Sequence, residues 1–251
     1  TIFWFRRDLR VEDNHGFFRA LSGKNKVIPI FIFDERILKK LPKSDARLEY
    51  ITVALGTIDS AMKRNRCGLG MYHGTPEAIF KKIIETWPIE KVVCNEDYEP
   101  YARERDTAIA ALLQTYNIPF ETYKDQVIFA KDEIVKDDGT PYRVYTPYSK
   151  RWLHNFFENT VSAYPSEEHL DRLASIEQPQ LNLGDLGFKP SKVHSPKPIF
   201  NDEIIRSYED TRNFPAIDQT SKTGTALRFG TLSIRAMVLK SAAVENPTFL
   251  K

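Results

Sequence analysis

The feature that most constrains the fold is a regular alternation of short apolar runs with amphipathic segments through the first half of the chain. Short apolar runs predict strands, and hydrophobic residues that recur with a 3.6-residue period predict helices. The apolar runs cover residues 2–5, 27–33, 69–72, 91–94 and 119–123. Because strands that alternate with helices need crossover connections, the pattern predicts α/β architecture: a doubly wound parallel sheet of about five strands with helices on both faces.

The helical periodicity is clearest over residues 48–62 and 109–116. Ser44 stands before the first of these segments, and Thr75 with Pro76 stands before another. Ser and Thr are favoured at the N-cap, and Pro is favoured at the first helical position, so we expect helices to begin at these points. Residues 1–128 are therefore predicted to form one α/β domain.

The alternation stops near the middle of the chain. Residues 133–145 predict two short strands joined at Asp138-Gly139, because glycine supplies the positive φ of a hairpin turn. Thr146 and Pro147 predict the N-cap and first residue of a helix. We therefore expect residues 129–200 to hold a hairpin, a helix and an interdomain linker rich in Pro, Ser and Glu.

Helical character resumes at Asn201-Asp202 and again from Ser233. Residues 201–251 are thus expected to be the start of an all-helical domain. The sequence has no initiator Met and ends at Lys251 within this helical part. We therefore expect an N-terminal fragment of a longer protein.

Composition is that of an ordinary globular protein, with 41% hydrophobic and 28% charged residues and no long uninterrupted apolar stretch. We expect a cytoplasmic protein with no membrane segment. A net charge of +2 gives little support to a nucleic-acid partner by itself. Cys67 and Cys94 lie far apart without CxxC spacing, so buried thiols are expected and no disulfide or metal site.

Polar clusters follow the first and fourth predicted strands: Arg6, Arg7, Asp8 and Arg10, and then residues 95–101. Both lie at the carboxyl edge of the sheet, where open α/β sheets bind ligands. Two interpretations stay open. Either the charges pair internally and cap a helix, or the acidic and aromatic side chains hold a planar ligand. No glycine-rich nucleotide motif follows any of the strands.

A third candidate lies near the end of the chain, in the run Thr220 to Gly224. Small hydroxyl residues and glycine allow backbone N–H groups to point at an anion. A pyrophosphate site is therefore one interpretation of this run, and an ordinary loop is the other.

Several blocks in chain order resemble the DNA photolyase and cryptochrome family. The opening FWFRRDLRVEDN is similar to the family's WFRxDLRxxDN, a long motif that is rarely met elsewhere. NEDYEPYARERD, PYRVYTPYSKRW and YEDTRNFP with TSKTGTALRFGTLSIR are similar to later family blocks. The resemblance spans essentially the whole chain and is greatest to class I cyclobutane pyrimidine dimer photolyases.

The resemblance implies light-driven repair of cyclobutane pyrimidine dimers in DNA. In such enzymes a reduced FAD gives an electron to the dimer, which is flipped out of the duplex. The implied partner is damaged DNA, the implied state is a monomer, and no catalytic residue is expected in this part, so we expect the chain alone to be inactive. A cryptochrome-type blue-light receptor is the alternative, and an isolated α/β module binding a small planar ligand is a third.

The resemblance also assigns site residues. Those implied to hold the FAD phosphates are Tyr208, Thr220, Ser221, Lys222, Thr223 and Gly224. Arg212 is implied to face a DNA phosphate beside the lesion pocket. The chain has Thr223-Gly224 where the family has Leu-Ser, which removes the serine hydroxyl.

An antenna pigment is implied as well. Folate-binding members share an Asn-Glu pair where this chain has Tyr101-Ala102, so folate is the less favoured antenna. Members with a deazaflavin-type antenna share an Arg and an Asp at the positions of Arg47 and Asp97. The expectation is a deazaflavin- or flavin-type antenna, or none.

Overall fold

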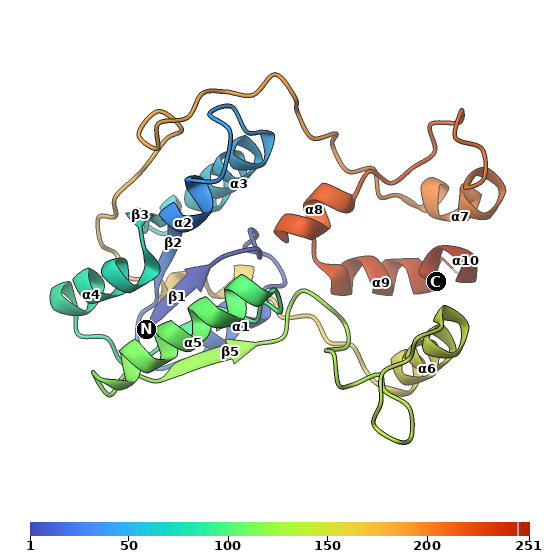
Figure 1. The fold of residues 1–251 in the computed structure, drawn as a ribbon, viewed down its shortest axis with the longest axis horizontal. Helices are drawn as coiled ribbons and strands as arrows, with labels where there is room; N and C mark the ends of the chain where they lie inside the picture. The colour runs from blue at the N-terminus through green and yellow to red at the C-terminus, as the bar shows by residue number, and fades with distance from the viewer. Residues whose placement is uncertain (245) are drawn as a thin grey trace.

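Five apolar runs form one parallel sheet in the computed structural model, which describes residues 1–244 and 246–251 (Figure 1). The strands are β1 (Ile2–Phe5), β2 (Ile28–Asp34), β3 (Gly70–Gly74), β4 (Val92–Asn95) and β5 (Phe120–Tyr123). Their order is β3-β2-β1-β4-β5, and every neighbouring pair is parallel. The predicted five-stranded parallel sheet is therefore confirmed.

Helices cover both faces of this sheet. They are α1 (His15–Leu21), α2 (Glu35–Leu38), α3 (Ala46–Lys63), α4 (Pro76–Thr86) and α5 (Pro100–Gln114). Successive residues of a strand point to opposite faces. Phe3 and Phe5 lie in the apolar cluster under α1 and α3, whereas Ile2 and Trp4 lie in the cluster under α4 and α5. Burial on both faces explains why the strands are almost continuously apolar.

Two helix starts among the first 100 residues were predicted from capping residues, and one of these two predictions is wrong. Thr75 caps α4 through its side chain. The cap of α3 is Asp45, whose carboxylate accepts the N–H of Arg47 at 2.9 Å. Ser44 lies outside the helix and donates its hydroxyl to the carbonyl of Pro190 at 2.9 Å. Ser and Asp are both favoured at the N-cap. Because the Ser44 hydroxyl bonds to Pro190, Asp45 is the residue that caps the helix.

The predicted hairpin is reduced to a turn. Gly139 has a φ of +78°, and Val135 and Pro141 form a single antiparallel bridge. The described residues form no strand on either side of this turn, so the prediction of two short strands is wrong. Pro141 has no N–H to donate, which prevents a ladder from extending through it.

Helix α6 (Tyr145–Glu158) follows this turn, and it begins before the residue predicted as its cap. Val144 holds the N-cap position, and Thr146 and Pro147 lie inside the first turn, so the predicted cap at Thr146 is wrong. The N–H groups of a first helical turn have no intrahelical acceptor, so proline fits at several of its positions and does not fix the start.

Part of the predicted linker packs on the sheet. The 3₁₀ helix η1 (Ser166–Arg172) is followed by Leu173, which forms a parallel bridge with Val27. Leu186 and Phe188 are buried in the cluster under α1 and α3. The stretch after these residues is largely exposed. The domain limits at residues 128 and 200 stay a prediction.

The last part of the chain forms α7 (Asp202–Thr211), α8 (Gly224–Phe229), α9 (Ile234–Ala243) and α10 (Pro247–Leu250). Asn201 and Ser233 cap α7 and α9, as their positions predicted, whereas α8 was not predicted. Figure 1 shows α8 and α9 beyond the ends of the strand arrows. Among the described residues, no helix is long and apolar enough to cross a membrane. Cys67 and Cys94 are buried, as expected.

Two residues of α3 test how the core is organised. Leu55 is fully buried, whereas Val53 is 65% exposed. Leu55→Ala is expected to lower the free energy of unfolding by about 2–5 kcal/mol, because it leaves a cavity under the sheet. Val53→Ala, the control on the same helix, is expected to change it by about 0.5 kcal/mol or less. Urea denaturation measures both, and equal effects would contradict this packing.

Candidate functional site at the carboxyl edge of the sheet

The strand order places β1 beside β4 in the middle of the sheet. The chain leaves these two strands for opposite sides, and such a switch point usually opens a ligand crevice at the carboxyl edge. The loop after β1 holds residues 6–14, and the loop after β4 holds residues 96–99. Both polar clusters singled out in the sequence therefore meet here.

Arginines from the first loop pair with acids from the second loop and from α5. The guanidinium of Arg6 lies 2.5 Å from a carboxylate oxygen of Asp106. Arg7 contacts Asp97 at 3.1 Å and Glu99 at 2.6 Å. Their side chains lie at the edge where an open α/β sheet binds its ligands. The arrangement matches internal pairing, one of the two interpretations of the sequence.

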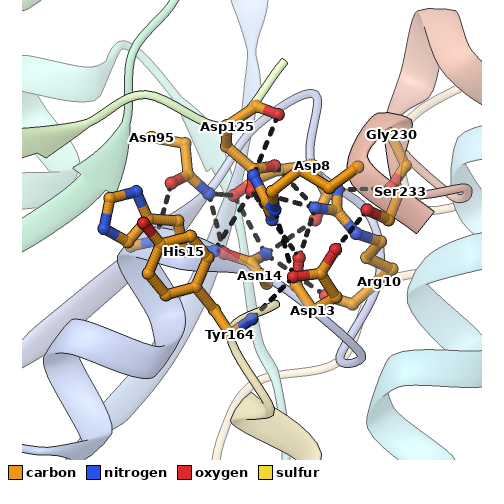
Figure 2. A network of polar contacts seen from close by, with 12 residues as sticks. Asp8, Arg10, Asp13, Asn14, His15, Asn95, Asp125, Tyr164, Gly230 and Ser233 are labelled. Atoms are coloured by element: carbon orange, nitrogen blue, oxygen red, sulfur yellow. Dashed lines mark hydrogen bonds and ion pairs between the residues drawn. The ribbon is translucent and has the colours of Figure 1, made fainter. Parts of the chain in front are cut away.

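Asp8 organises the loop from inside (Figure 2). One of its carboxylate oxygens accepts the N–H of Arg6 at 2.7 Å, and the other accepts the amide of Asn95 at 2.6 Å. Asn14 donates to the same oxygen at 3.3 Å, and its own side chain caps α1. Burial raises the pKa of Asp8 above its usual range. These contacts hold the loop and leave Asp8 no free face.

Asp125, which follows β5, is the centre of a buried ion network (Figure 2). Its side chain is 1% exposed and lies 2.9 Å from Arg10 and 2.8 Å from Arg235 of α9. Burial alone would raise the pKa of Asp125, but the two arginines outweigh it and hold the pKa below its usual range. Arg235 also pairs with Asp13 at 3.1 Å. We call Arg10, Asp13, Asp125 and Arg235 the edge ion network.

The turn between α8 and α9 closes over the same edge. Leu9 donates its N–H to the carbonyl of Phe229 at 3.0 Å, and Arg10 donates to the carbonyl of Gly230 at 3.1 Å. Gly230 has a φ of +66°. A Cβ at this position would lie 2.6 Å from the Cα of Asp8 and overlap the neighbouring carbonyl. Glycine is required here because the two backbones touch.

The predicted phosphate run lies just before α8. Lys222 is left-handed with a φ of +52°, and Thr223 is right-handed with a φ of −85°. Consecutive residues of opposite hand turn their N–H groups to one side and form a nest that binds anions. The hydroxyls of Ser221 and Thr223 lie 3.0 Å apart beside it. The run therefore fits a pyrophosphate by backbone geometry, and Lys222 itself pairs with Asp218 at 2.7 Å.

Tyr208 and Arg212 lie on α7 and at its end. The ring of Tyr208 packs edge-on against Phe249 at 5.0 Å, and the Arg212 guanidinium lies 5.6 Å from the Tyr208 ring centre. The structure thus brings these two residues together. Within the described residues, no hydrogen bond joins Tyr208 to the run 220–224, and no carboxylate pairs with Arg212.

The two candidate antenna residues have other partners. Arg47 pairs with Asp45 at 2.6 Å, and its side chain is 62% exposed. The side chain of Asp97 is 6% exposed, and its carboxylate accepts a hydrogen bond from the guanidinium of Arg7. No contact joins Arg47 to Asp97 in the described part of the chain. Tyr101 bonds to a different residue, Asp34 of β2, and burial with this contact raises the pKa of Tyr101 to about 12.

Three members of this edge were not recognised from the sequence: Asp125, Arg235 and Gly230. A carboxylate in a loop, an arginine on a helix and a glycine at a helix end have no spacing that relates them. Their partners lie 110 to 222 residues away along the chain. Only the resemblance gave a signal, because Gly230 and Arg235 fall within the last matching block.

Comparisons with known proteins agree on one family. Residues 1–167 match the DNA photolyase family. A deoxyribodipyrimidine photo-lyase of Synechococcus is 32% identical and matches 93% of this chain and 52% of its own. An uncharacterized 31.6 kDa protein of another Synechococcus strain is 31% identical, over 98% of this chain and 90% of its own. The crystal structure of a class III photolyase from Agrobacterium tumefaciens superposes with a TM-score of 0.81 at 25% identity, covering 99% of this chain and 55% of its own.

Gly230→Ala tests the contact between the two backbones. The added Cβ overlaps the loop after β1 and the left-handed φ is strained, so we expect the free energy of unfolding to fall by at least about 2 kcal/mol. Gly56→Ala is the control, because a Cβ there meets nothing within 4 Å and Gly56 lies within α3. Urea denaturation of both variants is the measurement. If Gly230→Ala left the free energy of unfolding unchanged, the turn would be free to move and the proposed close contact would be wrong.

Glu99 makes the edge sensitive to acid. Hydrogen bonds from Arg228 and Arg7 lower the pKa of Glu99 from 4.5 to about 2. A depressed pKa stabilises the folded state above the unfolded value, and this contribution is lost as the pH falls from 4.5 to about 2. Glu99→Gln should therefore flatten the dependence of stability on pH across that window. Urea titrations at several pH values measure it, and an unchanged slope would contradict the assignment.

Proposed function

Because the chain belongs to the DNA photolyase family, we propose that it acts in light-driven repair of cyclobutane pyrimidine dimers. The chain spans about half the length of the Synechococcus photo-lyase it matches. The observation that carries the proposal is the nest at Lys222 and Thr223, just before α8. The next helix, α9, is tied to the sheet by the edge ion network. A phosphate site at this place suits a bound dinucleotide cofactor.

In this proposal the FAD phosphates lie on the run Thr220 to Gly224, with Tyr208 beside them. The backbone N–H groups of Lys222 and Thr223 would donate hydrogen bonds to the pyrophosphate, and the hydroxyls of Ser221 and Thr223 would help to orient it. Reduced FAD, when bound, would supply the electron that splits the dimer and would receive it back. The chain's own contribution is placement, since none of its side chains needs to exchange a proton.

Placement depends on the sheet edge. Arg235 is held by Asp13 and Asp125, and α9 follows directly on the turn at Gly230. Because α8 begins at the phosphate run, fixing α9 also fixes the run relative to the α/β domain. We propose that the sheet positions the cofactor site in this way, without contacting the cofactor itself.

Arg212 is the proposed contact to DNA. It is exposed at the end of α7, and it has no carboxylate partner among the described residues. A guanidinium with free donors suits a phosphate that flanks a flipped dimer. Its position over the Tyr208 ring keeps it next to the proposed cofactor site.

The antenna proposal is a deazaflavin- or flavin-type pigment at the carboxyl edge near Arg47 and Asp97. Asp97 already pairs with Arg7, so a pigment there would have to share this ion pair. Folate remains less favoured, because Tyr101 is engaged with Asp34.

A cryptochrome-type blue-light receptor is the second candidate, since the same motifs support it. We also propose that α7 to α10 alone provide too little of the flavin site for the chain to repair DNA unaided. The complete polypeptide that carries this sequence is therefore the one to assay.

The test is dimer splitting by that polypeptide with reduced FAD. An oligonucleotide with one cyclobutane dimer is illuminated with blue light, and recovery of the pyrimidine ultraviolet absorbance is followed. We expect recovery in the light and none in the dark. A flavin-loaded protein that binds the oligonucleotide without splitting the dimer would overturn the repair proposal and favour the receptor.

Arg212→Ala is expected to weaken binding of dimer DNA by about 1.5–3 kcal/mol, roughly a tenfold to hundredfold change, because a charged hydrogen bond to phosphate is lost. FAD content should stay unchanged. Arg206→Ala, on the exposed side of the same helix, is the matched control. Fluorescence anisotropy with labelled DNA measures both. Equal affinities for the two variants would remove Arg212 from the interface.

A further inference from the structure

A cluster of lysines lies away from the phosphate run, where the turn between α2 and α3 meets the linker. We call it the linker lysine patch, and it consists of Lys40, Lys43, Lys189 and Lys192. All four side chains are exposed. Within the described chain, none of the four lies within ion-pair distance of a carboxylate, whereas neighbouring cations such as Lys39 are paired. The patch is therefore a set of charges that the fold leaves unneutralised.

The two segments of the patch are held together by backbone contacts. Lys189 donates its N–H to the carbonyl of Lys43 at 2.8 Å. Ser191 donates its N–H to the carboxylate of Glu49 at 2.6 Å. Figure 1 shows the linker arching past the turn between α2 and α3. The fold thus fixes lysines from distant parts of the sequence side by side, although like charges repel.

The acids near the patch do not pair with its lysines. Asp45 pairs with Arg47 at 2.6 Å, and Glu35 pairs with Lys39 at 3.2 Å. Glu49 accepts the linker N–H described above and lies 3.5 Å from His194. Glu49 and Asp185 keep their negative charges, but among the described residues neither lies within ion-pair distance of a patch lysine.

The concentration of charge is out of proportion to the chain as a whole. Residues 39–49 and 185–192 hold six Lys and Arg against three Asp and Glu, whereas the whole chain has a net charge of only +2. The remainder of the chain is therefore net acidic. Positive charge gathered on one face attracts polyanions, because it raises the local potential well above that of the rest of the surface.

We propose that the linker lysine patch binds the phosphate backbone of duplex DNA outside the lesion. Lysines on flexible stems, with no pocket formed around them, suit contacts that do not depend on base sequence. The linker continues from the patch to α7, which ends at Arg212. The patch would hold undamaged duplex while Arg212 contacts the lesion. The inference rests on the proposed function only in taking DNA as the polyanion.

The test compares binding of undamaged duplex by the complete polypeptide and by Lys43→Gln/Lys189→Gln/Lys192→Gln. Each lost phosphate contact should reduce the slope of log K against log salt by about 0.9. We expect a weaker affinity at low salt and a shallower slope, with the ratio of dimer to undamaged affinity unchanged. Replacement of the same three lysines by arginine should preserve both.

Lys81→Gln/Lys82→Gln on α4 is the matched control, because these two lysines are also exposed. It should leave the slope unchanged. Lys43 lies 5.2 Å from the Phe188 ring centre, so thermal unfolding of each variant checks that the fold is intact.

An unchanged slope in a folded triple Gln variant would overturn the inference, as would loss of binding to phosphatidylserine vesicles without loss of DNA binding. Failure of the proposed function looks different, since dimers would stay unsplit in the light while the patch still altered the salt slope.

Discussion

The buried carboxylate of Asp125 between Arg10 and Arg235 is the interaction on which the rest of this structure depends. Two arginines from distant parts of the chain meet one acid that water hardly reaches. Such buried pairs add little net stability, because the desolvation of the ions offsets their attraction. Losing one partner, however, costs about 3–5 kcal/mol, because a charge is left buried without compensation. The network therefore acts mainly by dictating where α9 lies.

The position of α9 also changes what lies at the switch point between β1 and β4. In an open α/β sheet the gap between β1 and β4 is the expected ligand site. Here Arg6 and Arg7 form ion pairs at this gap, and the turn at Gly230 contacts the loop that follows β1. The crevice has become the interface between the sheet and the helical segment. The proposed phosphate run lies one short helix away, so its position follows from the same contacts.

Much of the fold was predictable, because its signals are local. Apolar runs and 3.6-residue periodicity locate the strands and the long helices, and Asn201 and Ser233 mark two helix starts. The errors come from competition between equivalent local signals. Ser44 and Asp45 are both good caps, and a contact with the linker decided between them. The prediction of a hairpin was wrong because Asp138-Gly139 indicates only a turn. A hairpin also needs flanking segments that can pair as strands.

The sequence by itself determined the parallel sheet, the buried thiols and the family motifs, since each depends on residues close together in the chain or on a recognisable block. Only the tertiary structure decided which charges meet. No local motif marks Asp13 or Asp125, and both pair with Arg235 of α9. Likewise, Lys43 and Lys189 are brought together by a backbone hydrogen bond between distant parts of the chain. An ion pair or a backbone contact forms only where two groups lie within a few ångströms of each other. Residue patterns along the sequence do not say which distant residues the fold brings that close.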